Sequence, residues 1–294
     1  MNQGYKEFSV RRILVPLDAA EHSQAALETA AEIAALQDAE LEGLYVEDIN
    51  LLQLCELPFA REVSMFGSVV RQLSRPDVER QLRIMARRVY RALAAAAERH
   101  KVRWKFRVAR GGVPAEILAA AENADLTILG KAGWSRLLQP KMGSTVRTVV
   151  ARGRGLTLIM QQGVRFEARA SVVFTGSALA EKAVSIAASL GKVKGLDLLV
   201  LLLGRDPKDN ERLRQLAGEI VSHQGVQASF QGIRENTSEA LVRAVHSAAP
   251  GPVFIPCDAP GFQGDALQGL INRLNTPVFL VRPSPDEEPA PAAR

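Results

Sequence analysis

The chain has few cysteines and no metal-ligand pattern. Of its 294 residues only two are cysteines, Cys55 and Cys257, and they lie in different halves of the sequence. This count argues against a disulfide framework or a metal cluster and fits a reducing compartment. The histidines show no ligand spacing and are interpreted as surface or helix-capping residues; they stand at positions 22, 100, 223 and 246.

Long apolar segments are also missing. The longest apolar runs, such as residues 196–203, are far too short to span a bilayer. The N-terminal segment MNQGYKEFSVRR has no apolar core of the kind found in signal peptides. Hydrophobic residues make up 47% of the chain and charged residues 23%, which is typical of globular domains. The sequence therefore predicts a cytoplasmic protein without a membrane partner.

The net charge of +5 is carried by the first part of the chain. Residues 1–160 contain 23 Lys/Arg and 18 Asp/Glu, whereas residues 161–294 contain 14 of each. This asymmetry suits an anionic ligand in the first part, although a solvated basic face produces the same count.

One segment, residues 76–99, carries arginines at helical spacing, namely Arg80, Arg83, Arg87 and Arg91. Such a stripe is compatible with nucleic-acid binding. However, Tyr90 is the only aromatic residue in this segment, and the chain has no recognised nucleic-acid motif. We therefore interpret the stripe as a solvated helix face and do not expect nucleic acid as a partner.

Apolar periodicity predicts alternating strands and helices along the whole chain. In the first part, strands are expected at 11–17, 40–46, 102–109, 125–129 and 155–160, and helices at 22–36, 76–99, 113–122 and 143–152. The order then repeats, with strands at 171–175, 196–202, 226–231, 253–255 and 277–281, and helices at 178–190, 207–223, 238–249 and 265–274. Such alternation is typical of parallel sheets covered on both faces.

The repeat predicts two tandem α/β domains of one fold. Their expected bounds are residues 1–162 and 168–283, with the boundary in a short polar stretch. The remaining residues, 284–294, are rich in proline and acidic side chains and are expected to be disordered.

A glycine-rich segment follows the fourth expected strand. Residues 130–145 read GKAGWSRLLQPKMGST, and neither the Walker P-loop nor Gly-x-Gly-x-x-Gly occurs in the chain. A strand, a glycine loop and a helix N-terminus together can hold a phosphate, because glycine allows close approach and first-turn N–H groups are free. From the residues alone, a phosphate site and an ordinary capped strand-to-helix loop both remain open.

Several motifs together resemble the ATP-binding universal stress proteins. Gly130-x2-Gly133-x9-Gly143-Ser144 is similar to the nucleotide motif of that family. The first expected strand ends in Pro16-Leu17-Asp18 and leads into a Ser-x-x-Ala-Leu helix, and residues 41–47 resemble the family's second strand. The resemblance covers residues 11–160. It implies a Rossmann-like fold of the universal stress protein/HUP type, with two tandem doubly wound five-stranded parallel sheets.

The resemblance also implies one nucleotide site, with ATP as the ligand, alone or with Mg²⁺. The implied contacts to adenine and ribose are Pro16, Leu17, Asp18 and Val46. The implied contacts to ribose and phosphates are Gly130, Lys131, Gly133, Gly143, Ser144 and Thr145. Family domains pair through their last strand, which implies a homodimer or an intramolecular pseudo-dimer.

The second copy of the pattern lacks these residues. Thr175-Gly176-Ser177 replaces the Pro-x-Asp end of the first strand. If Gly264 and Asp265 take the places of Gly143 and Ser144, a carboxylate stands where a phosphate would bind. The sequence therefore predicts no nucleotide in the second domain.

Three functions follow for the whole chain. The leading one is a nucleotide-binding stress-response or regulatory module. The alternatives are a slow ATPase or autophosphorylating enzyme, and a structural or interaction protein that binds no nucleotide. Fast turnover is not expected, because no clear base accompanies Ser144 and Asp18 is the only motif carboxylate.

A long connection, residues 49–76, separates the second strand from its following helix. Connections of this length are often functional, and this one is rich in apolar residues over 49–65. It could cover the ligand site or form a dimer contact. The preferred interpretation is a helical turn packed on its own domain.

Overall fold

The computed structural model describes most of the chain. The described segments are residues 9–18, 20–57, 59–63, 70–131, 142–161, 169–233, 237–248 and 251–284. We call residues 9–161 the first half and residues 169–284 the second half. The expected boundary residues 162–168 and the tail residues 285–294 lie outside the described residues. No helix within the described segments is long and apolar enough to cross a membrane.

Both halves show the predicted alternation of strands and helices. The first half contains β1 (Arg12–Pro16), α1 (Glu21–Gln37), β2 (Glu40–Asp48), α3 (Arg75–His100), β5 (Trp104–Gly111), α4 (Val113–Ala121), β6 (Leu126–Gly130), α5 (Ser144–Arg152) and β7 (Leu156–Met160). The second half contains β8 (Arg169–Phe174), α6 (Ala178–Lys194), β9 (Asp197–Leu202), α7 (Pro207–Gln224), β10 (Ala228–Gly232), α8 (Ser238–Ser247), β11 (Val253–Pro256), α9 (Gly264–Arg273) and β12 (Val278–Val281).

The connection between β2 and α3 has structure of its own. It contains a short helix, α2 (Ile49–Leu54), and an antiparallel hairpin of β3 (Arg61–Val63) and β4 (Val70–Gln72). Asp48 begins α2 as its N-cap, because its Oδ1 accepts a hydrogen bond from the Asn50 N–H at 3.0 Å. α2 packs against α3, as the preferred interpretation of this connection expects.

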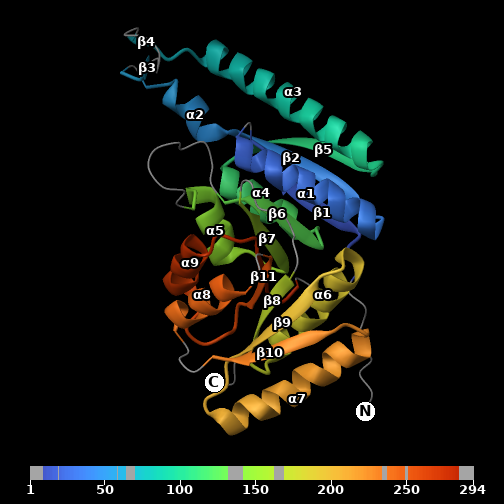
Figure 1. Ribbon diagram of the computed structural model, residues 1–294. Coiled ribbons are helices and arrows are strands. Elements are labelled where there is room, and N and C mark those ends of the chain that lie inside the picture. Colours follow the sequence, from blue (N-terminus) through green and yellow to red (C-terminus); the bar gives the residue numbers. More distant parts are fainter. Residues whose placement is uncertain are drawn as a thin grey trace, which may run out of the picture.

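Ten strands form one continuous sheet in the order β10-β9-β8-β11-β12-β7-β6-β1-β2-β5, which Figure 1 shows running through the middle of the molecule. Within each half all neighbouring strands are parallel, and both halves have the same strand order. The predicted fold of two doubly wound five-stranded parallel units is therefore confirmed.

The halves meet at their last strands, β7 and β12, which pair antiparallel. Leu156 lies opposite Val281, and Ile159 lies opposite Val278. Leu158 and Phe279 occupy matching positions in the two halves and lie opposite each other, so this register relates the halves by a local two-fold axis. The edge strand of each half is thus covered by the other half, which removes an open sheet edge from the centre of the molecule.

Two apolar layers cover the faces of the sheet. Helices α1, α3, α6 and α7 contribute to one layer, and α4, α5, α8 and α9 contribute to the other. The central strands are therefore buried on both faces, which explains uninterrupted apolar runs such as residues 198–202 of β9. The outer strands β5 and β10 contain no fully buried residue.

A glycine allows α3 to lie close to the end of β1. A Cβ at Gly43 of β2 would come within 2.5 Å of Leu93 Cδ2 and 3.1 Å of Leu17 Cδ1. Leu93 is fully buried and belongs to the apolar face of α3 that the sequence spacing predicted. This packing holds Leu17, and with it the residues that follow β1, against the sheet.

Candidate functional site

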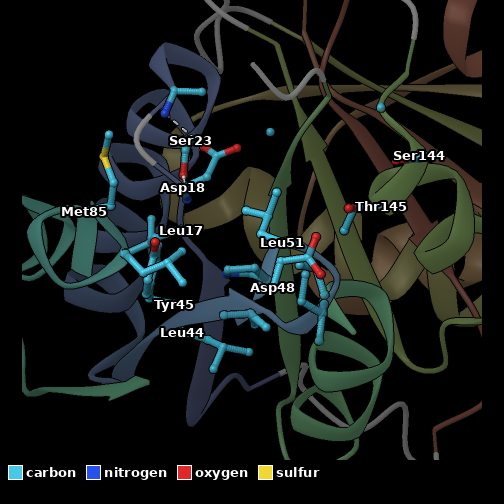
Figure 2. Close-up of a pocket in the computed structure, with 18 of the residues that line it drawn as sticks. Leu17, Asp18, Ser23, Leu44, Tyr45, Asp48, Leu51, Met85, Ser144 and Thr145 are labelled. Carbon is cyan, nitrogen blue, oxygen red and sulfur yellow. Dashed lines mark hydrogen bonds between the residues drawn. The ribbon is translucent and has the colours of Figure 1, made fainter. Parts of the chain in front are cut away.

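A cavity of about 640 Å³ opens at the carboxyl ends of the first-half strands, shown in Figure 2. Its lining comes from the ends of β1, β2 and β6 and from the N-terminal parts of α3, α4 and α5. The strand order reverses here, because β1 lies between β2 and β6. Open α/β sheets bind their ligands at this kind of position.

Most of the site residues implied by the sequence meet at this cavity. Those that line it are Pro16, Leu17, Asp18, Val46, Gly130, Gly143, Ser144 and Thr145. Two of the implied residues are not among the lining. Gly133 lies outside the described residues, and Lys131 is described but is absent from the described lining.

Asp18 is held in place by the backbone around it. The Leu17 N–H donates to the Leu44 carbonyl at 2.8 Å, which extends the pairing of β1 and β2. The Asp18 N–H then donates to Ser23 Oγ, and Asp18 Oδ1 accepts from the Ala20 N–H, both at 3.0 Å. These bonds fix an exposed carboxylate at the cavity, where it can accept hydrogen bonds from ligand hydroxyls.

The first turn of α5 presents backbone donors to the cavity. Gly143 is the N-cap residue, and no side chain of the described residues caps this helix. The first hydrogen bond of the helix runs from the Arg147 N–H to the Gly143 carbonyl at 2.9 Å. The N–H groups of Ser144, Thr145 and Val146 precede that bond, so they have no acceptor within the helix. Together with the helix dipole, they make this end of the cavity suitable for an anion.

The polar and apolar sides of the cavity face one another. Figure 2 shows Ser144 and Thr145 on one side, with Leu17, Tyr45 and Met85 across from them. Burial, followed by the negative charges of Glu47 and Asp18, raises the pKa of Tyr45. The Tyr45 hydroxyl therefore stays protonated at neutral pH and can donate a hydrogen bond.

Lys131 reaches into the contact between the two halves. Its Nζ donates to the carbonyls of Leu274 at 3.0 Å and Asn272 at 3.3 Å, at the C-terminal end of α9. A helix C-terminus attracts a cation because its last carbonyls are unpaired. The Lys131 side chain is 2% exposed, and this burial lowers its pKa to about 8. The ammonium group is thus held by α9 rather than directed at the cavity.

The other stem of the glycine loop contacts the same helix. The Met142 N–H donates to Asn272 Oδ1 at 3.1 Å, and the Gly143 N–H donates to the Lys131 carbonyl at 3.2 Å. Residues 132–141 are not described, but both residues that flank them are therefore attached to the second half. Motif spacing did not indicate this contact, because its partners are more than a hundred residues apart.

Much of the cavity wall comes from residues outside the motif. The additional apolar residues come from α2, α3 and α4 and the segments before them, and include Leu51, Leu73, Val78, Leu82, Met85, Val113 and Ile117. The periodicity of α3 predicted a helix but not that part of it would line a ligand cavity. The only sequence signal for these residues is the long connection after β2, for which covering the ligand site is one expected role. Leu51 and Leu73 of that connection do line the cavity.

The described lining contains carboxylates and no basic side chain. Asp18 and Asp48 are its acidic residues, and no lysine or arginine belongs to it. Mg²⁺ bound together with phosphates needs only one or two protein carboxylates, so Asp18 and Asp48 are compatible with such an ion. Within the described segments, no group of three or more His, Cys, Asp or Glu residues could hold a metal ion by itself.

The corresponding end of the second half has a different lining. The matching burial patterns of α5 and α9 superpose Gly143 on Gly264 and Ser144 on Asp265. The loop before the helix is seven residues long there, 257–263, against thirteen residues, 131–143, in the first half. Phe262 of the short loop is fully buried in the apolar layer.

Comparisons with known proteins agree with this architecture. The model of the universal stress protein family matches residues 9–154. A universal stress protein from Archaeoglobus fulgidus DSM 4304 superposes with a TM-score of 0.73 at 18% identity, covering 94% of this chain and 99% of that chain. A functionally unknown protein from Pseudomonas aeruginosa PAO1 superposes with a TM-score of 0.59 at 12% identity, covering 97% and 95%. No curated protein sequence matches the chain. With the family's domain over residues 9–154, the first half of the chain belongs to the universal stress protein family.

Proposed function

We propose that the first half binds an adenine nucleotide in this cavity and that the chain acts as a nucleotide-binding stress-response module. ATP, alone or with Mg²⁺, is the ligand that the family motif implies. The observation that carries the proposal is the convergence of Asp18, Gly130 and the open first turn of α5 on one cavity. This convergence lies where the strand order reverses.

Each part of the nucleotide has a counterpart in the cavity. The N–H groups and hydroxyls of Ser144 and Thr145 would bind a phosphate at the start of α5. Asp18 would accept hydrogen bonds from the ribose hydroxyls, and Gly130 would let the sugar approach the backbone. The apolar side chains near Val46 would cover the base. Lys131 would act from outside the cavity, by holding the glycine loop against α9.

We also propose that residues 1–162 and 168–283 are two domains that form a pseudo-dimer. The antiparallel pairing of β7 and β12 supports it, because the last strands, through which family domains are expected to pair, are already paired within this chain. The nucleotide is assigned to the first domain alone, since the second carries Asp265 and a buried Phe262 at the corresponding place.

A calorimetric titration with ATP and Mg²⁺ tests the binding function. Gly143→Asp places a carboxylate against the phosphate position, and we expect it to weaken binding at least about a hundredfold by charge repulsion. Gln263→Asp is the matched control, because Gln263 is the N-cap of α9 in the second half, and it should bind as the wild type does.

Two outcomes would count against the proposal. If the wild type shows neither binding heat nor thermal stabilisation at millimolar ATP, the nucleotide function fails. If Gly143→Asp binds as well as the wild type, the nucleotide lies elsewhere. Phosphate release measured in the same samples distinguishes a binding module from an enzyme. Sustained ATP turnover in the wild type that is abolished in Gly143→Asp would favour an ATPase.

A further inference from the structure

The cavity has two apolar walls that belong to opposite faces of the sheet. The α4 wall consists of Val113 and Ile117, from the helix layer that includes α5. The α3 wall consists of Val78, Leu82 and Met85. Leu51 of α2 also lines the cavity. The cavity therefore joins the two helix layers at the carboxyl edge of the sheet instead of lying within one of them.

An adenine ring needs only one of these walls. It is a single flat group, and the phosphate it carries must reach the first turn of α5. Figure 2 shows Met85 of the α3 wall across the cavity from Thr145. A nucleotide that places its base on one wall and its phosphate at α5 leaves the other wall without an apolar partner. Exposed apolar surface of this kind favours a ligand that covers it.

The charges of the lining point to a ligand with few negative charges. The described lining residues include Asp18 and Asp48 but no lysine or arginine, and the ammonium of Lys131 is bound to the C-terminal carbonyls of α9. Within the described lining, the positive potential comes from one helix N-terminus, which is equivalent to about half an elementary charge. One phosphate matches this potential better than three.

From these two observations we infer that the site prefers an adenosine monophosphate ester, with an alkyl group on its phosphate, over ATP. The single phosphate would lie at Ser144 and Thr145. The apolar group would cover the wall that the base leaves open and extend past Leu51. This inference rests on the proposed nucleotide site and specifies the chemical class of its ligand.

Calorimetric titration with three probes tests the preference directly. The probes are AMP, ATP with Mg²⁺, and adenosine 5′-octyl phosphate. We expect the octyl ester to bind one site per chain at least about tenfold more tightly than AMP, because its methylene groups leave water on binding. We also expect it to bind more tightly than ATP. An octyl ester that binds no better than AMP, or ATP as the tightest ligand, would overturn the inference while leaving the nucleotide site intact.

Two leucines of α2 provide a matched pair of variants. Leu51 and Leu54 are both 44% exposed, so neither is needed for folding, but only Leu51 is among the residues that line the cavity. With Leu51→Asp, the affinity ratio of octyl ester to AMP should fall to about threefold or less. With Leu54→Asp, the ratio should stay at the wild-type value. An equal fall in both variants would mean that the octyl chain binds elsewhere, which also overturns the inference. If none of the probes binds, the proposed function itself fails.

Discussion

The two halves share one fold and differ where their strands end. Both have the same order of five parallel strands and the same two helix layers. At the carboxyl edge, the first half has a cavity of about 640 Å³. The second half has apolar side chains there, among them Leu203, Ile233 and Phe262, each at most 8% exposed. The residues that pack the sheet are thus distinct from the residues that leave room for a ligand.

Two local changes account for this difference. Strand registers place Thr175 in the second half where the first half has Asp18, so the carboxylate after the first strand is missing. The loop before the last helix is shorter by six residues and is closed by turns, with the Phe262 N–H bonded to the Ala259 carbonyl at 3.2 Å. The short loop of the second half places the Phe262 ring in the apolar layer.

The second half also contributes contacts that hold residues next to the site of the first half. α9 holds both stems of the glycine loop through Lys131 and Met142. A reciprocal contact runs from the guanidinium of Arg282, after β12, to the Val150 carbonyl near the end of α5. The comparison teaches that a copy without its own site can still determine the geometry of its neighbour's site.

The largest expected effect follows from removing the buried ring of the second half. Phe262→Ala should lower the free energy of unfolding by about 3–5 kcal/mol, because a fully buried phenylalanine is replaced by a cavity. Urea unfolding measures this loss. Phe59→Ala in the first half is the control, since Phe59 is 74% exposed, and it should cost less than about 0.5 kcal/mol. A small effect of Phe262→Ala would mean that the second half is not filled as described.

The buried ammonium of Lys131 should give stability a distinctive pH dependence. Its pKa is about 8 in the folded protein and 10.5 ordinarily. Between these values the unfolded chain binds more protons, so the contribution of Lys131 to the free energy of unfolding should rise with pH, by about 3 kcal/mol in all.

Urea unfolding of Lys131→Met at several pH values tests this rise. The variant has no ammonium to bury. The free energy of unfolding of the wild type should therefore rise relative to that of the variant from pH 8 to 10.5. Lys192→Met, at an exposed position of α6, should follow the wild type at every pH. A constant difference between wild type and Lys131→Met would contradict the buried contact with α9.

A smaller effect is expected for the second contact between the loop and α9. Asn272→Ala removes the acceptor of the Met142 N–H and should lower the free energy of unfolding by about 1 kcal/mol. Nucleotide affinity should also weaken by a few fold, because the stem of the loop is no longer held. Asn275→Ala, an exposed position on the same segment, should change neither. Equal effects at both positions would show that α9 does not position the loop through Asn272.

The smallest effect concerns the basic stripe of α3. Arg83 and Arg87 are exposed, and Arg83 only approaches Glu79 at 3.8 Å. Combined Arg83→Ser and Arg87→Ser substitutions should change stability by less than about 0.5 kcal/mol. Gel mobility of DNA should be unaffected by either protein. A salt-dependent mobility shift that the double variant abolishes would instead assign nucleic-acid binding to the first half.

The fold could be read from the sequence because its signals are local. Apolar runs such as residues 126–129 and the helical spacing of Leu82, Val89 and Leu93 each depend on one segment. The largest deviation among the main helices is α6, which extends to Lys194 instead of ending at residue 190. Glycine often marks a helix end, but Gly191 lies inside α6, where a Cβ would come within 3.0 Å of the Leu196 carbonyl oxygen.

The site could be predicted only in part, because its walls come from distant segments. Pro16, Asp18 and Ser144 were found through motifs that end strands or begin a helix. Met85 could not be found in this way, since its position in the apolar pattern of α3 is shared by core residues such as Val89 and Leu93 that do not line the cavity. The contact of Lys131 with Leu274 depends on how the two halves pack, which no local pattern encodes.

The central claim is that one nucleotide binds per chain and that it binds in the first half. The number of nucleotides bound by the purified wild type and by Gly143→Asp, counted by calorimetric titration with ATP and Mg²⁺, tests this claim most directly. We predict one nucleotide per wild-type chain and none in the variant. Two nucleotides per wild-type chain, or one remaining in Gly143→Asp, would contradict the assignment of the site to the first half.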